Sequence, residues 1–134
     1  MFVCTGNRAR SQMAEGILRH LAGDRFEVFS AGTEPKGLAS ATVNVMREVG
    51  IDVASHRSKS IQEFVGIKLD YVITLCNAAR ASCSRLGRVA HYRHWDISDP
   101  ADLEREGADR IEAFRTARDQ LRSRIEGFIR VATG

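Results

Sequence analysis

Residues 4–11, Cys-Thr-Gly-Asn-Arg-Ala-Arg-Ser, combine a nucleophile with groups suited to binding an anion. Apolar residues before Cys4 indicate a strand, and the apolar spacing after Ser11 predicts a helix. A tight loop there would turn backbone N–H groups inward at a helix N-terminus, where the dipole adds positive charge. Gly6 lets the backbone approach an anion closely, and Arg10 offers a planar fork for two of its oxygens. The same field favours the thiolate of Cys4, which is its nucleophilic form.

A buried apolar cysteine, followed by a solvated Arg10, is the simpler interpretation of this stretch. Cys-x5-Arg alone is a weak signal, but its place between a strand and a helix favours an oxyanion site. We therefore assign the loop to oxyanion binding, with Arg8 adding positive charge at its mouth. The assigned residues are Thr5, Gly6, Asn7, Arg8, Ala9, Arg10 and Ser11.

Length and composition favour one folded domain over residues 1–134. No apolar run approaches the ~18 residues of a membrane span, and no secretory signal stands at the start. The net charge of +3 is too small to imply nucleic acid, although it mildly favours anionic substrates. Three cysteines without a secretion signal indicate reduced, reactive thiols in a cytoplasm. Their spacing does not suit zinc, so we expect neither a metal nor a cofactor.

Strands and helices are expected to alternate along the chain, which predicts a parallel α/β sheet. The expected strands cover residues 1–3, 26–30, 69–75 and 89–92, the third of them buried on both faces. The expected helices cover residues 11–22, 37–49 with Gly50 as the C-terminal cap, 60–66 and about 108–131.

Three chemically active side chains follow predicted strands. Cys4, Cys76 and Asp99 each come just after a strand, and ligands of open parallel sheets bind beyond the carboxyl ends of the strands. Asp99 precedes Pro100, so it is either a turn residue or a catalytic acid. Because all three residues are expected at the same edge of the sheet, we favour a catalytic role for Asp99.

Cys76 and Cys83 are separated by seven residues, and they are either small packing residues or a redox pair. Seven residues of helix rise about 10.5 Å, whereas a disulfide needs Cα atoms roughly 4.4–6.8 Å apart. If residues 77–82 are helical, oxidation must unwind them. Asn77 and Ser82 are modest helix formers, but the alanines between them are good ones, so the ease of unwinding stays open.

Motifs along nearly the whole chain resemble the low-molecular-weight tyrosine phosphatase fold and, within it, the arsenate reductases that use thioredoxin. The resemblance implies one three-layer α/β/α domain with a four-stranded parallel sheet. The matching stretches are Cys4–Asn7, Ala9–Gly16, Ser30–Thr33, Gly50–Asp52, His56–Ser60, Asp70–Cys76, His94–Trp95 and Asp99–Pro100.

The resemblance also implies a relay of three thiols. Cys4 attacks arsenate held by Arg10 and the loop amides, and Asp99 acts as general acid. Cys76 then attacks the sulfur of the Cys4–arsenic adduct, which releases arsenite and leaves a Cys4–Cys76 disulfide. Cys83 attacks Cys76, and a small redox protein reduces the resulting Cys76–Cys83 disulfide.

Other residues are assigned supporting roles by the same resemblance. Ser11 is expected to donate to the Cys4 thiolate, and Asn7 to hold the loop. Some family members bind a monovalent cation through residues matching Asn7, Glu15, Ser30 and a carboxylate, and here Lys59 stands in place of that carboxylate. The Lys59 ammonium is therefore either a substitute for the cation, paired with Glu15, or an ordinary surface charge.

We expect a cytoplasmic monomer that acts on arsenate, with thioredoxin as reductant and glutaredoxin or a small thiol as the alternative. A phosphatase acting on aryl phosphates is one rival, because Cys4, Arg10 and Asp99 suffice for that chemistry. Against it, Ala101-Asp102 replaces the aromatic pair of the phosphotyrosine cleft. The other rival is an oxyanion-binding redox sensor without turnover, in which Asp99 would be superfluous.

Overall fold

The centre of the fold is a parallel sheet, here described in a computed structural model that covers residues 1–101 and 107–133. Within those residues four strands pair in the order β2-β1-β3-β4. They are β1 (Phe2–Cys4), β2 (Ser30–Gly32), β3 (Leu69–Thr74) and β4 (Val89–His94). Phe2 pairs with Ser30 on one side and Ile73 on the other, so β1 lies in the middle of the sheet.

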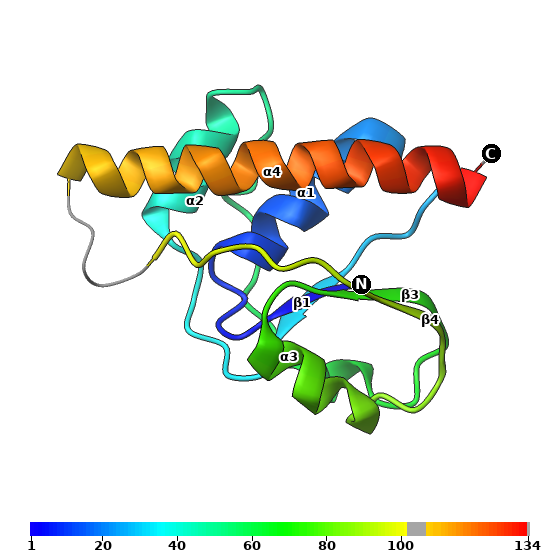
Figure 1. The fold of residues 1–134 in the computed structure, drawn as a ribbon. Helices are drawn as coiled ribbons and strands as arrows, with labels where there is room; N and C mark the ends of the chain where they lie inside the picture. Colours follow the sequence, from blue (N-terminus) through cyan, green and yellow to red (C-terminus); the bar gives the residue numbers. More distant parts are fainter. Residues whose placement is uncertain (102–106, 134) are drawn as a thin grey trace.

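Helices cover both faces of this sheet. Helices α1 (Arg10–Ala22), α2 (Ser40–Arg47) and α4 (Gly107–Thr133) lie on one face (Figure 1). Helix α3 (Asn77–Ser82) lies on the other, with the 3-10 turns η1 (Ile61–Phe64) and η2 (Cys83–Arg85). The predicted three-layer α/β/α arrangement with a four-stranded parallel sheet is therefore confirmed.

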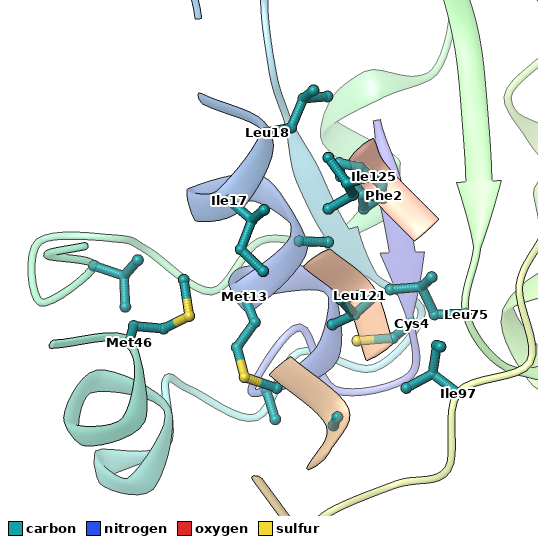
Figure 2. Packing of buried hydrophobic residues seen from close by; sticks show 14 of the residues in the cluster. Phe2, Cys4, Met13, Ile17, Leu18, Met46, Leu75, Ile97, Leu121 and Ile125 are labelled. Carbon is teal, nitrogen blue, oxygen red and sulfur yellow. The ribbon is translucent and has the colours of Figure 1, made fainter. Parts of the chain in front are cut away.

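Each face of the sheet has its own hydrophobic core, because successive strand residues point to opposite sides. Phe2 and Cys4 enter the core beneath α1, α2 and α4, where Cys4 lies with Leu75, Ile97 and Leu121 (Figure 2). Val3 enters the second core, whose members include Leu69, Val72, Ala79, Cys83 and Leu86. The first and third cysteines therefore belong to different cores.

The second strand is displaced from its predicted position. Phe26 and Val28 do pack against the larger core, but pairing with β1 begins only at Ser30. The predicted strand at 26–30 was wrong because a parallel strand needs a partner, and β1 offers one only along Phe2–Cys4. The carbonyl group of Val28 instead accepts a hydrogen bond from the Arg19 guanidinium at 2.7 Å.

The other predicted elements are present with adjusted ends. Gly37 does not open α2, because its φ of +84° is left-handed and the helix starts at Ser40. Gly50, with φ +78°, ends the turn that follows α2. Strand β3 is buried at Val72–Thr74, but Asp70 is exposed, so burial on both faces holds for only part of it. None of the described helices is long and apolar enough to span a membrane.

Candidate active site

The loop between β1 and α1 turns its carbonyl groups outward. Those of Cys4, Thr5, Gly6 and Arg8 accept hydrogen bonds of 2.8–3.2 Å from backbone N–H groups of residues 33–39. The C=O and the following N–H of a trans peptide point in opposite directions, so the next amides face the inside of the loop. Together with the N-terminus of α1 they form a site for an anion.

The end of β2 passes close beneath this loop. A Cβ atom at Gly32 would lie 2.6 Å from the carbonyl oxygen of Thr5 and 2.8 Å from the backbone nitrogen of Asn7. Both distances are too short for any side chain, so only glycine fits at this position. Gly32 therefore lets the sheet support the loop from below.

A directed hydrogen-bond chain leads to the sulfur of Cys4. The backbone N–H of Lys59 donates to Asn7 Oδ1 at 2.8 Å, which fixes the orientation of that buried amide. Asn7 Nδ2 then donates to the hydroxyl oxygens of Ser11 at 2.7 Å and Ser30 at 2.9 Å. Ser11 Oγ lies 2.8 Å from Cys4 Sγ. The Ser11 proton is thereby left to point at the sulfur, a contact that stabilises a thiolate.

Arg10 is a buried charge at the edge of the first core, the one that contains Leu75 and Ile97. Its Nη1 donates to the Ile97 carbonyl at 3.1 Å, and its Nη2 lies 3.6 Å from Asp99 Oδ2. Asp99 is half-exposed and also accepts from the backbone N–H of Ala101 at 2.9 Å. The structure thus makes Asp99 both a turn residue and a neighbour of the loop.

A cavity of about 420 Å³ opens above Cys4. Arg10 and Asp99 line it together with the loop. Arg8, Lys36 and Arg110 add positive charge to its wall, of which the sequence interpretation included only Arg8. The residue Asp102, which entered the argument against a phosphatase, lies outside the described residues.

Behind the loop lies a cluster of charges around the buried carboxylate of Glu15. It accepts from the Ser30 hydroxyl at 2.6 Å and pairs with Arg19 at 2.8 Å and Lys59 at 3.7 Å. Burial lowers the pKa of Lys59, while Glu15 acts in the opposite direction. The Lys59 side chain is thus mostly buried, and its ammonium group supplies positive charge beside Glu15.

Cys76 links the loop to residues 76–83, here called the redox segment. It is half-buried and packs against both hydrophobic cores, whereas Cys4 and Cys83 each belong to one. Its Sγ lies 3.3 Å from the Thr5 hydroxyl and accepts from the backbone N–H of Ala79 at 3.4 Å as the N-cap of α3.

Cys83 is buried beyond the end of α3, and all three cysteines are free thiols. Burial in the second core raises the pKa of Cys83 to about 11, with Cys76 as a smaller cause. Residues 77–82 are helical, so a Cys76–Cys83 disulfide requires this helix to unwind. Among the described residues, no three His, Cys, Asp or Glu side chains gather where they could hold a metal ion.

Comparison with known proteins agrees with this geometry. The family model described as low molecular weight phosphotyrosine protein phosphatase matches residues 1–133. The chain belongs to that family. Arsenate reductase 1 of Staphylococcus epidermidis is 42% identical over 127 residues, covering 95% of this chain and 92% of the relative. The arsenate reductase of Shouchella clausii is 40% identical, covering 95% and 91%.

A solved structure described as an arsenate reductase in the phosphate binding state also matches. It has a TM-score of 0.83 and 33% sequence identity, and the match covers 96% of this chain and 94% of that one. The resemblance drawn from the motifs is therefore confirmed, both for the family and for its arsenate reductase members.

Two residues that support the loop, Gln12 and Ser58, were not assigned a role from the sequence. Gln12 is fully buried, and its Nε2 donates to Asn7 Oδ1 at 3.0 Å and to the Arg57 carbonyl at 3.0 Å. The Ser58 hydroxyl donates to the Asn7 carbonyl at 3.0 Å. Gln12 could have been found from the sequence, because it is a polar residue beside the apolar stripe of the first helix. Ser58 lies within the matching stretch His56–Ser60, but the resemblance was not used to give it a role.

Proposed function

We propose that this protein reduces arsenate to arsenite through a relay of Cys4, Cys76 and Cys83. The observation that carries the proposal is the position of Cys76, which contacts both cores while the other two thiols lie on opposite faces of the sheet. A single exchange between Cys4 and Cys83 would have to cross the sheet. Two exchanges through Cys76 avoid that crossing.

The first step takes place in the cavity above Cys4. Arsenate binds to the inward amides and Arg10, and the Cys4 thiolate displaces a hydroxyl group that Asp99 protonates. Asp99 has access to the cavity and lies 3.6 Å from Arg10, so both groups reach one bound oxyanion. The product is a covalent Cys4–arsenic adduct.

The second step uses Cys76, whose sulfur lies 3.3 Å from the hydroxyl of Thr5 at the edge of the loop. Cys76 attacks the sulfur of the adduct, so the arsenic leaves with two electrons as arsenite and a Cys4–Cys76 disulfide remains. Engaging Cys76 Sγ in a disulfide changes the cap of α3, to which it contributes an acceptor. The first disulfide thereby weakens the helix that must unwind next.

The third step moves the disulfide to the other face of the sheet. Cys83 leaves its buried site, loses its proton to solvent and attacks Cys76, which frees Cys4 as a thiolate. Reduction of the Cys76–Cys83 disulfide by an external dithiol completes the cycle. We take thioredoxin as that dithiol, with glutaredoxin or a small thiol as alternatives, and expect a monomer in the cytoplasm.

Phosphatase activity is the second candidate, because Cys4, Arg10 and Asp99 already share one cavity. These three groups suffice to form and hydrolyse a phosphocysteine. Ala101 stands in the wall of that cavity and offers no aromatic surface for a phosphotyrosine ring. We therefore expect only weak hydrolysis of aryl phosphates.

The deciding experiment is arsenate-dependent oxidation of NADPH in the presence of thioredoxin and thioredoxin reductase. Wild type should turn over, whereas Cys76→Ser and Cys83→Ser should each lose steady-state turnover. Hydrolysis of an aryl phosphate is measured in the same three proteins as a control for a folded loop. Hydrolysis without arsenate turnover, equal in all three, would make the protein a phosphatase.

A further inference from the structure

Tyr92 makes a contact with the redox segment that the relay does not yet include. Its ring lies on β4 and is 47% exposed, and its hydroxyl donates to the carbonyl oxygen of Cys83 at 3.1 Å. The same carbonyl accepts the backbone N–H of Leu86 at 3.1 Å. The sheet is thus fastened to the turn that holds the third thiol.

The phenol stays a donor across the neutral pH range. Partial burial raises the pKa of Tyr92, and the nearby Cys83 acts in the same direction. A cavity of about 470 Å³ borders both residues, so there is space beside the contact for the turn to move.

This hydrogen bond belongs to the helical dithiol state. With α3 intact, residues 77–82 keep Cys76 and Cys83 too far apart for a disulfide. Forming the disulfide unwinds α3 and draws Cys83 out of the second core, which carries its carbonyl away from Tyr92. The phenol therefore stabilises the reduced form relative to the oxidised one.

We propose that Tyr92 is a positioning residue that raises the reduction potential of the Cys76–Cys83 couple by holding the Cys83 turn in its reduced conformation. The inference rests on the proposed function. In the exchange that forms this disulfide, the Cys4–Cys76 bond breaks and the Cys76–Cys83 bond forms, Cys83 gives its proton to solvent, and Cys4 leaves as thiolate. No electrons are gained or lost overall.

The Tyr92 hydrogen bond affects the last two steps of the cycle in different ways. A higher potential makes the final disulfide a better electron acceptor for the external dithiol. The hydrogen bond from Tyr92 also keeps Cys83 buried and protonated until the first disulfide has formed. Tyr92 thereby protects the third thiol in the resting protein and promotes its re-reduction after turnover.

The test isolates the pair in a Cys4→Ser protein, where Cys76 and Cys83 are the remaining thiols. The Cys4→Ser, Cys4→Ser/Tyr92→Phe and Cys4→Ser/Tyr71→Phe proteins are equilibrated with mixtures of reduced and oxidised dithiothreitol, and the disulfide fraction is measured. Tyr71 is the matched control, because its ring packs on Phe128 of α4, on the opposite face of the sheet from α3.

Tyr92→Phe should favour the disulfide by about two- to tenfold, the range expected for one hydrogen bond. That is a potential about 9 to 30 mV more negative, at 29.6 mV per tenfold change. Alkylation of Cys83 by iodoacetamide in the reduced protein, mapped by mass spectrometry, should accelerate by a similar factor. Tyr71→Phe should change neither quantity.

An unchanged potential in Tyr92→Phe, or equal shifts in both tyrosine variants, would overturn the role of Tyr92 while leaving the relay intact. Failure of the Cys76–Cys83 disulfide to form with Tyr92 present would contradict the relay itself, and the role of Tyr92 with it.

Discussion

The hydroxyl of Ser11 lies 2.8 Å from the sulfur of Cys4, and Asn7 sets the direction of that contact. The Asn7 amide donates to Ser11 Oγ, so the serine proton is available to the sulfur. The Asn7 orientation is itself fixed by the backbone N–H of Lys59. The nucleophile is thus connected to the segment behind the loop by three hydrogen bonds in series.

Ser11→Ala should slow both the chemistry and the alkylation of Cys4. Hydrogen bonds to charged groups contribute about 1.5–3 kcal/mol, which corresponds to roughly a 10- to 100-fold loss. The measurements are kcat/KM for arsenate and the rate of Cys4 carboxymethylation at pH 7. Ser40→Ala, at the exposed first residue of α2, is the matched control. Equal rates in the two variants would contradict a role for Ser11.

Asp99→Asn should lower kcat for arsenate about 100-fold or more, as expected for loss of a general acid. The KM should not rise, because the substitution removes a negative charge 3.6 Å from Arg10. Asp96→Asn serves as the control, because Asp96 also lies in the segment that follows β4 but does not line the cavity. If Asp99→Asn kept the wild-type kcat, Asp99 would not be the general acid, and its role would be limited to the turn contact with Ala101.

The Lys59 ammonium beside Glu15 predicts that potassium does not alter activity. Kinetics in potassium chloride and in choline chloride of equal ionic strength should coincide for the wild type. Lys59→Ala removes the positive charge and should make KM for arsenate depend on potassium. A clear potassium-dependent gain in affinity for the wild type would show that the ammonium does not replace a cation.

Glu48 connects α2 to α4 and predicts an acid dependence of stability. Arg115 donates to its carboxylate at 2.7 Å and Arg118 at 2.8 Å, and these hydrogen bonds lower the pKa of Glu48 to about 2. Because the pKa of Glu48 is lower in the folded protein than the value of 4.5 expected in the unfolded chain, this carboxylate stabilises the fold above pH 4.5. That contribution is lost as the pH falls towards 2.

Glu48→Gln should therefore lower the unfolding temperature at pH 7, and the difference from wild type should shrink between pH 4.5 and 2. Thermal unfolding followed by circular dichroism gives both values. Glu126→Gln, which alters an exposed pair within α4, should have little effect. A Glu48→Gln deficit that persists unchanged at pH 2 would mean that the ion pairs are not its cause.

The parts of the fold that were predictable carry local signals. The loop around Cys4 has its chemistry in consecutive residues, and α4 has buried Phe114, Leu121 and Ile125 at helical spacing. The second strand was misplaced because alternation at Phe26 and Val28 reports burial. It does not report pairing with β1.

The parts that were not predictable come from contacts between distant segments. The need for glycine at position 32 follows from its approach to Thr5 and Asn7, 27 and 25 residues away in sequence. The hydrogen bond from Tyr92 to Cys83 likewise depends on the packing of α3 against the sheet. Such contacts leave no periodic pattern in the sequence.

Disulfide mapping after a single turnover tests the relay most directly. Fully reduced protein receives one equivalent of arsenate without any external reductant, is quenched with acid, and is mapped by mass spectrometry. The relay predicts one equivalent of arsenite, a disulfide between Cys76 and Cys83, and a free Cys4. In Cys83→Ser the disulfide should stop between Cys4 and Cys76. Three free thiols, with arsenate recovered unchanged, would contradict the account.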